Sequence, residues 1–484
     1  MRRIAALARP EAAETAVLVM LAALPLVAVA ERRLIELVFP LLAVPLMAFF
    51  AAEGRPREIL TAWTQWFRTP LGVAGLATLG WMLLSPLWSP DPRFSAIGAV
   101  KVAGLAAAAL PLALLLGRIP RDRIFAPLTV ALALGGLLMM LENASGGSAH
   151  RLLGYGLSGD MQVYRYTNRS WFQDYNIRQQ ATGATMVAAL LLWPCAGWLV
   201  LHGRRAGAAG LIALVWVVGS LGTSGAALLG LLTGTAILAL GLWRIRAAVI
   251  LVFAQIAGSL ALAPFLGPVL RQLPVASLQW LAQHHAAERI ELWTGYMDLW
   301  PMEWLTGFGF HAVKLLGSEA KRAVLLPGTS TLDAPHPHDL PIQILFEFGL
   351  VGAALVVLLT ALACIACLRG RSPSRPFAVA TAATIWAISL VDYDLWYPWW
   401  TSIVTLSLLL AVRLLREGPA SVPYGSGALP IRMASSTWST VMSLRQFRWP
   451  NGHSRLKQGR QSSSTSRIRA RALRGGVTAG LDEP

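Results

Sequence analysis

The sequence predicts an all-α protein that crosses a membrane about twelve times. Three observations support this class: hydrophobic residues make up 55% of the 484 residues, charged residues make up only 13%, and the mean hydropathy is +0.56. Soluble domains carry about one-quarter charged residues. The low charge therefore excludes a soluble globular protein.

Twelve apolar segments recur along the first 415 residues, and each is a candidate to cross a hydrocarbon core of about 30 Å. They cover residues 13–30, 34–52, 71–88, 97–117, 124–141, 182–202, 207–222, 225–243, 247–266, 341–368, 376–391 and 399–415. Residues 28–30 resemble a signal-peptide cleavage site, but a second apolar segment follows almost at once. We therefore interpret the first segment as a retained helix.

Arginines mark alternate connections between these segments. The clusters are Arg2, Arg3 and Arg9; Arg55, Arg57 and Arg68; Arg118, Arg121 and Arg123; Arg204 and Arg205; Arg244 and Arg246; Arg369, Arg371 and Arg375; and Arg413 and Arg416. Short positively charged loops stay in the cytoplasm, so both termini are predicted to be cytoplasmic. Arg32 and Arg33 are the exception, because they fall in an outer turn.

Two long connections then lie on the outer face, residues 142–181 and 267–340, and the second precedes the tenth span. The tail, residues 416–484, is rich in Ser, Gly and Arg, so we expect a disordered cytoplasmic segment. Topology and tail account for the net charge of +17, which favours contact with anionic membrane lipids over a nucleic-acid partner. The three cysteines lie in apolar segments and predict neither a disulfide framework nor a metal site.

The stretch from His336 to Gly352 joins a polar loop to an apolar helix. Asp339 is predicted to cap that helix and Pro341 is tolerated in its first turn. His338 then lies at the positive end of the helix dipole, where a neutral imidazole can accept a proton. The alternative is a capping loop whose histidines only lie at the membrane interface.

Several further side chains are candidates for binding an anionic substrate. Lys101 and Glu347 are ionisable groups inside predicted spans, and such groups are functional candidates by default. Arg178 lies at the mouth of the sixth span. Asp392 and Asp394 resemble the Asp-x-Asp of metal-dependent transferases, but nucleotide sugars are not expected outside the membrane, so pairing with outer arginines or orienting an acceptor is the better hypothesis.

Within the second outer loop, four residues recur at helical spacing: Arg289, Trp293, Tyr296 and Trp300. They predict one face of a helix that lies along the membrane surface. The alternative for the aromatic residues is an interfacial anchor.

Together these features resemble the O-antigen ligase and O-antigen polymerase superfamily of bacterial envelope glycosyltransferases, over about residues 70–415. The stretch 335–340 is similar to the family's His-Asn or His-Ser loop, and its continuation is matched by Gln343, Glu347, Gly349 and Gly352. A second match, to the family's Arg-x-x-x-Trp segment and Gly-x-Gly turn, comprises Arg289, Trp293, Pro301, Gly307 and Gly309. Asp339 replaces the usual Asn or Ser, and Gly225 replaces an arginine that follows Thr-Ser in the family.

The resemblance implies a GT-C-like fold in the bacterial inner membrane. The implied activity is transfer of an undecaprenyl-diphosphate-linked glycan to an acceptor on the periplasmic face, and in the ligase branch the acceptor is a sugar of the lipid A core. No cofactor or metal is implied. His338 would be the base, Arg289 and Arg178 would bind the diphosphate with Lys101, and Asp339, Gln343 and Glu347 would support the site.

Three alternatives remain open at this point. An O-antigen polymerase and a protein O-oligosaccharyltransferase share the histidine loop, and the sequence does not separate their acceptors. A polytopic transporter or flippase belongs to another class, and it would require more ionisable residues within the spans than Lys101 and Glu347.

Overall fold

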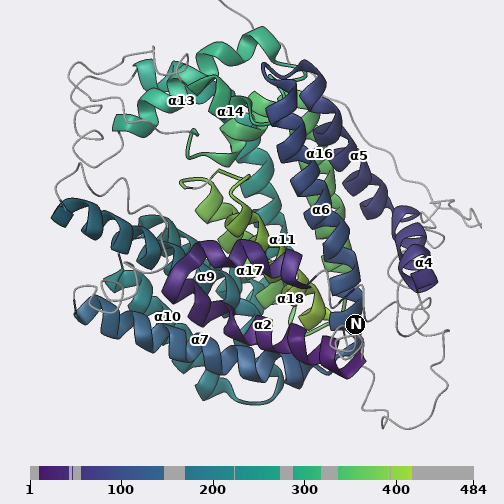
Figure 1. Ribbon diagram of the computed structural model, residues 1–484, viewed down its shortest axis with the longest axis vertical. Helices are drawn as coiled ribbons and strands as arrows, with labels where there is room; N and C mark the ends of the chain where they lie inside the picture. Colours follow the sequence, from purple (N-terminus) through teal and green to yellow (C-terminus); the bar gives the residue numbers. More distant parts are fainter. Residues whose placement is uncertain are drawn as a thin grey trace, which may run out of the picture. The chain divides into compact units, whose positions relative to one another are not determined.

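The computed structural model describes residues 10–42, 46, 56–145, 169–222, 224–272, 287–317, 336–392 and 394–416. The described helices are α2 (Pro10–Glu31), η1 (Arg32–Leu37), α4 (Pro56–Phe67), α5 (Pro70–Leu84), η2 (Ser85–Trp88), α6 (Pro92–Arg118), α7 (Arg121–Ala144), α9 (Arg169–Leu201), α10 (Arg205–Leu221), α11 (Gly225–Gln272), α13 (Ala287–Leu299), η4 (Trp300–Glu303), α14 (Ala312–Leu315), α16 (Leu340–Arg369), α17 (Arg375–Ser389) and α18 (Pro398–Leu415). The protein is therefore helical throughout the described segments, as predicted (Figure 1). The tail beyond Arg416 lies outside them.

Within the described ranges, eight helices are long and apolar enough to cross a membrane. The difference from twelve has three sources. The first predicted span and the described start of the second form one candidate span, Glu14–Leu42. Spans eight and nine form α11, in which Arg244 is non-helical at φ −141° and ψ 86°. Spans seven and eleven correspond to α10 and α17, which have only 17 and 15 residues. A multi-pass architecture is confirmed, and the number twelve stays a prediction.

Two apolar cores organise these helices. One joins α2, α7, α9, α10 and α18, with α9 at its centre, because 89% of the apolar window in Gln180–Leu201 is buried. The other joins α11, α13, α16 and α17. Helix α5 packs beside α16, and α6 packs against α5 and η2 (Figure 1), so α16 is bordered by an element distant in sequence.

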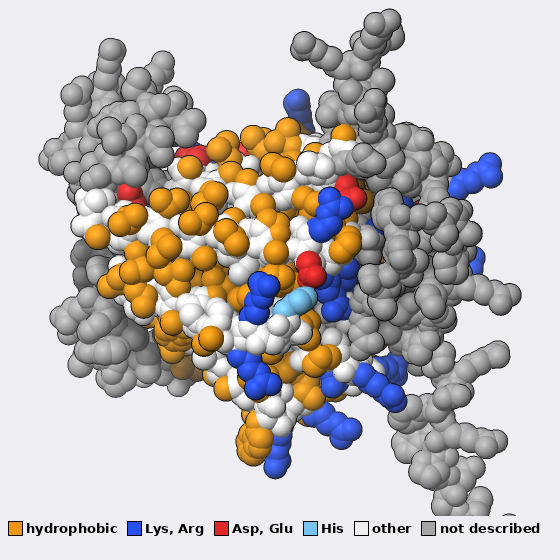
Figure 2. All heavy atoms as spheres, turned by 90° about the horizontal axis from the view of Figure 1, so that it is seen from below, with side chains coloured by type: hydrophobic (Ala, Val, Ile, Leu, Met, Phe, Trp, Pro, Cys, Tyr) orange, Lys and Arg blue, Asp and Glu red, His pale blue; other side chains and the backbone are white. Residues whose placement is uncertain are grey.

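Hydrophobic side chains also cover the outside of the molecule. Figure 2 shows one face on which they occupy a wide area, with Lys and Arg side chains gathered to one side. Leu87, Trp243 and Leu262 are 76%, 74% and 64% exposed. Proteins in water rarely expose large apolar patches, so this surface favours contact with lipid.

The arginine-rich ends of distant helices meet one another. Arg413 of α18 donates to the carbonyls of Leu116 and Ile119 at the end of α6, at 2.7 and 2.8 Å. Arg123 of α7 pairs with Glu14 of α2 at 2.5 Å. The opposite ends of α16 and α18 lie near the histidine loop, because Asp339 caps α16 and the ring of Tyr397, directly before α18, lies 5.6 Å from that of His336. The alternation of arginines thus corresponds to a segregation in space, and the side of the membrane that each end faces stays a prediction.

Helix α16 is interrupted at Gly349, which has φ 63° and ψ −163°. The interruption frees backbone groups, and the loop after η4 pairs with them. Phe308 and Gly309 donate their N–H groups to the carbonyls of Phe346 and Glu347, at 2.8 and 2.9 Å. Unpaired backbone groups inside a membrane are costly, so this pairing allows the helix to break there.

Glycine is required on both sides of this contact. A Cβ on Gly307, at φ 69°, would lie 2.5 Å from the backbone of Glu347, and a Cβ on Gly349 would lie 2.2 Å from the carbonyl of Leu305. The Trp81 indole donates to the carbonyl of Phe348 at 3.1 Å. The Gly-x-Gly turn noted in the sequence therefore fastens the outer loop to α16.

Candidate functional site

The histidine loop lies directly before the first turn of α16. Asp339 caps the helix, as predicted, because its carboxylate accepts the N–H of Ile342 at 2.8 Å. His338 has φ 52°, a left-handed conformation that non-glycine residues seldom adopt. Its N–H donates to Nδ1 of His336 at 3.3 Å, and the two rings lie 4.0 Å apart. His336 therefore helps to hold the strained turn that presents His338.

Two carboxylates between α17 and α18 face this loop in different ways. Oδ1 of Asp392 lies 3.5 Å from Nδ1 of His338, which is too long for a strong hydrogen bond. Asp394 is fully buried, accepts from Nε2 of Gln343 at 2.7 Å and pairs with Nζ of Lys314 at 2.9 Å. Asp392 is thus the carboxylate that faces the histidine, whereas Asp394 belongs to the layer below it.

Gln343 and Glu347 connect that deeper layer to α16. Gln343 also accepts the N–H of Leu395 at 3.1 Å, and the Trp396 indole donates to Oε2 of Glu347 at 2.5 Å. Glu347 is fully buried and its Oε1 has no hydrogen-bond partner in the described part of the chain. Both side chains hold the loop after α17 in place, in keeping with the supporting role predicted for them.

Burial and nearby charges shift the pKa values of the titratable groups at the histidine loop in different directions. Burial, with a smaller effect from the charge of His338, lowers the pKa of His336 to about 3, so its ring is neutral and Nδ1 can accept. Burial raises the pKa of Asp339 to about 7, opposed by its hydrogen bond to the Ile342 N–H. Burial also acts to raise the pKa of Asp394, but the charge of Lys314 holds it below its usual value. Asp394 is therefore a carboxylate at neutral pH.

Helix α13 lies against this site. Tyr296 is fully buried, donates its hydroxyl to the carbonyl of Val313 at 2.8 Å and lies 4.9 Å from the ring of Phe346. This residue therefore packs inside the protein, and the position of α13 along the membrane surface stays a prediction. Trp293 donates its indole N–H to the carbonyl of Pro337 at 2.8 Å, so it braces the histidine loop.

The three cations that the sequence predicts to bind the diphosphate differ in how the structure describes them. Arg289 lies in the first turn of α13, one turn before Trp293, and is half-buried. Lys101 is exposed on α6. The side chain of Arg178 lies outside the described residues. The structure therefore brings His338, Asp392, Asp394, Gln343 and Glu347 together, with Trp293 behind the loop.

Sequence reasoning missed Lys314, which replaces the outer arginines as the described partner of Asp394. Its Nζ also lies 5.3 Å from the centre of the Tyr397 ring. An isolated lysine belongs to no sequence pattern, so only the fold reveals this pair.

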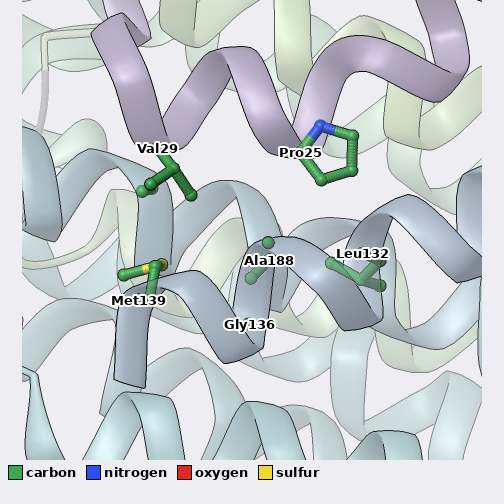
Figure 3. A pocket seen from close by; sticks show the side chains of 8 residues that line it. Pro25, Val29, Leu132, Gly136, Met139 and Ala188 are labelled. Atoms are coloured by element: carbon green, nitrogen blue, oxygen red, sulfur yellow. The ribbon is translucent and has the colours of Figure 1, made fainter. Parts of the chain in front are cut away.

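Figure 3 shows a separate hollow between α2, α7 and α9, lined by apolar residues such as Pro25, Val29 and Met139. The residues that line it carry no titratable side chain. No protein-family model matches this chain, and no curated protein matches it.

We expect Asp339→Asn to be more stable than the parent protein at pH 8 and to have a smaller advantage at pH 5. The folded-state pKa of Asp339, about 7, lies above its ordinary value of 3.8, so the folded protein binds an extra proton between these values. Stability therefore falls as pH rises from about 4 to 7, by up to about 1.4 kcal/mol per pH unit. Asparagine caps a helix as well as aspartate does. Thermal midpoints in detergent between pH 5 and 8 measure this, and a difference independent of pH would contradict it.

Proposed function

We propose that this protein transfers a glycan from undecaprenyl diphosphate to an acceptor sugar on the periplasmic face of a bacterial inner membrane, with lipid A-core as the acceptor. The observation that carries the proposal is His338, a partly exposed imidazole in a left-handed turn beside Asp392 and above the Lys314–Asp394 pair. In a chain so poor in charge, this concentration of titratable groups at the start of one helix supports catalysis there.

The chemistry follows from these groups. Nδ1 of His338 is buried and faces Oδ1 of Asp392, so we assign the uptake of the proton of an acceptor hydroxyl to Nε2 of this partly exposed side chain. The acceptor oxygen then bonds to the anomeric carbon, the bond from that carbon to the diphosphate oxygen breaks, and the diphosphate leaves with the electron pair. Fixed cations near that oxygen lower the barrier, and Arg289 and Lys314 are the candidates at this end. The step needs no cofactor or metal.

The decisive experiment is transfer by the purified full-length protein. Undecaprenyl-diphosphate-linked glycan is supplied with lipid A-core, with a second donor molecule, or with a protein acceptor. A product with lipid A-core supports the ligase, a longer carrier-linked chain supports a polymerase, and a glycoprotein supports an oligosaccharyltransferase. Absence of any product with all three acceptors would contradict the proposal.

One observation favours a second candidate, a transporter. Discontinuous helices with buried acidic residues beside the break are typical of secondary transporters, and α16 breaks at Gly349 with Glu347 buried next to it. Transport would move an unchanged lipid-linked glycan across liposome membranes. Movement without transfer would favour this candidate over the ligase.

We expect Arg289→Ala to lower transfer about 10²-fold and Arg289→Lys to retain part of the activity, because lysine keeps the charge and loses the two-pronged donor geometry. Initial rates at saturating acceptor measure this. Arg93→Gln is the control, because Arg93 is an exposed arginine on α6. A normal rate for Arg289→Ala would remove Arg289 from donor binding.

A further inference from the structure

Lys101 is an exposed lysine inside a membrane span. It lies in α6 (Pro92–Arg118), about 14 Å along the axis from the first residue at about 1.5 Å per residue. Within the described parts of the chain it forms no ion pair. A charge at this depth is costly unless it reaches water or meets an opposite charge.

The neighbours of Lys101 on α6 show that this lysine lies between a side of the helix packed on protein and an exposed apolar side. Gly98, one turn earlier, packs against His311, because an added Cβ would lie 2.4 Å from Nε2 of that ring. On the other side, Ile97 and Val100 are 52% and 65% exposed. At about 100° per residue, Lys101 falls between the packed side and the exposed apolar side. It therefore lies on the edge between lipid and protein.

His311 continues this edge toward the candidate site. It adopts φ 62°, is only 7% exposed, and its Nδ1 has no hydrogen-bond partner in the described segments. Burial first, then the charges of Lys314 and Lys101, lower the pKa of His311 to about 4, and Asp394 opposes them. The neutral ring is thus flanked by two lysines. The N–H of Lys314 donates to the carbonyl of His311 at 3.0 Å, and its ammonium reaches Asp394.

We propose that Lys101, His311 and Lys314 mark a lateral route along which the diphosphate head of a polyprenyl lipid moves from the bilayer into the site. The polyprenyl chain remains on the exposed apolar side of α6, where Phe94 is 41% exposed and Ile97 and Val100 follow. Charge complementarity selects an anionic lipid, because Lys101 has no ion pair among the described residues and His311 is neutral, whereas Lys314 at the inner end is paired with Asp394. The identity of the lipid rests on the proposed function, whereas the route itself does not require glycan transfer.

Binding to the purified full-length protein in detergent tests the route, with undecaprenyl diphosphate as the probe. Undecaprenol supplies the chain without the charge, and inorganic pyrophosphate supplies the head without the chain. We expect Lys101→Met to weaken binding of undecaprenyl diphosphate about 10-fold or more, Lys101→Arg to change it less than about 3-fold, and undecaprenol binding to stay unchanged. Arg93→Gln, which removes an exposed cation from the same helix, should bind as the parent does.

A lysine that only extends to water predicts a different result. Lys101→Met would then bind undecaprenyl diphosphate as tightly as the parent protein, and this outcome overturns the route. Equal weakening by Arg93→Gln also overturns it, because general electrostatic attraction would explain both variants. Loss of pyrophosphate binding to the same degree as lipid binding overturns the lateral path, because it places Lys101 at the final phosphate position.

Photo-crosslinking tests the route without a substitution at Lys101, so it remains informative if Lys101→Met does not fold. A photoreactive residue at Ile97 should capture undecaprenyl diphosphate, and one at Leu232, which is 51% exposed on α11, should not. Equal capture at both positions overturns the route. If Ile97 captures the lipid and His338→Ala still transfers glycan normally, the catalytic role of His338 fails and the route stands.

Discussion

His338→Ala is expected to lower glycan transfer by about 10²-fold or more while the protein stays folded, because a lost general base typically costs 10²–10⁴-fold. The side chain of His338 is 27% exposed, and it contacts Asp392 only at 3.5 Å. Its removal therefore leaves no strong hydrogen bond broken in the described part of the chain. Initial rates with purified protein measure the effect, and donor binding should stay within about 3-fold of the parent.

The neighbouring histidine supplies a matched comparison. His336 is 3% exposed and accepts the His338 N–H on Nδ1. Asparagine can place an oxygen close to the position of Nδ1, whereas glutamine reaches the position of Nε2. His336→Asn should therefore keep most of the transfer activity, and His336→Gln should lose more. If His338→Ala transferred glycan at the parent rate, the base would lie elsewhere and stabilisation by cations would be the main source of rate enhancement.

The start of α16 could be predicted from sequence because its signals are local. Asp339 caps the helix and Pro341 lies in its first turn, and both depend on residues within one helical turn. The break at Gly349 could not be predicted in the same way. Residues 341–368 are apolar apart from Gln343, Glu347 and Thr360, and the groups that pair with the broken turn come from the loop around Gly307. An internal glycine alone does not distinguish a packed helix from an interrupted one.

The site shows the same limit. The proximity of His338 to α16 follows from the order of residues, but the carboxylate that faces it is Asp392 and not the adjacent Asp339. Tyr296 shares helical spacing with Trp293, yet burial against Phe346 decided its environment. Lys314 and Asp394 are 80 residues apart in number (394 − 314), so their contact depends on tertiary packing and not on local sequence.

Lys314→Met should destabilise the protein by about 3–5 kcal/mol, because it leaves the charge of Asp394 buried without its cation. Asp394 is fully buried, and its remaining described partners, Gln343 and the N–H of Trp396, are neutral. Asp394→Asn should cost less, because Lys314 is 24% exposed and can turn toward water. The double variant should recover much of the loss. Thermal and denaturant midpoints in detergent measure all three proteins.

The pH dependence separates this charge effect from a general packing defect. In the parent protein Lys314 helps to hold the pKa of Asp394 below its usual value, so this carboxylate contributes stability near neutral pH that is lost as pH falls through the acidic range. In Lys314→Met, burial acts without that cation and raises the pKa. The folded variant then binds a proton more readily than the unfolded chain, and its stability rises as pH falls from about 7 to 5. Parallel pH profiles for the parent and Lys314→Met, or no recovery in the double variant, would show that the ion pair does not control the stability of this site.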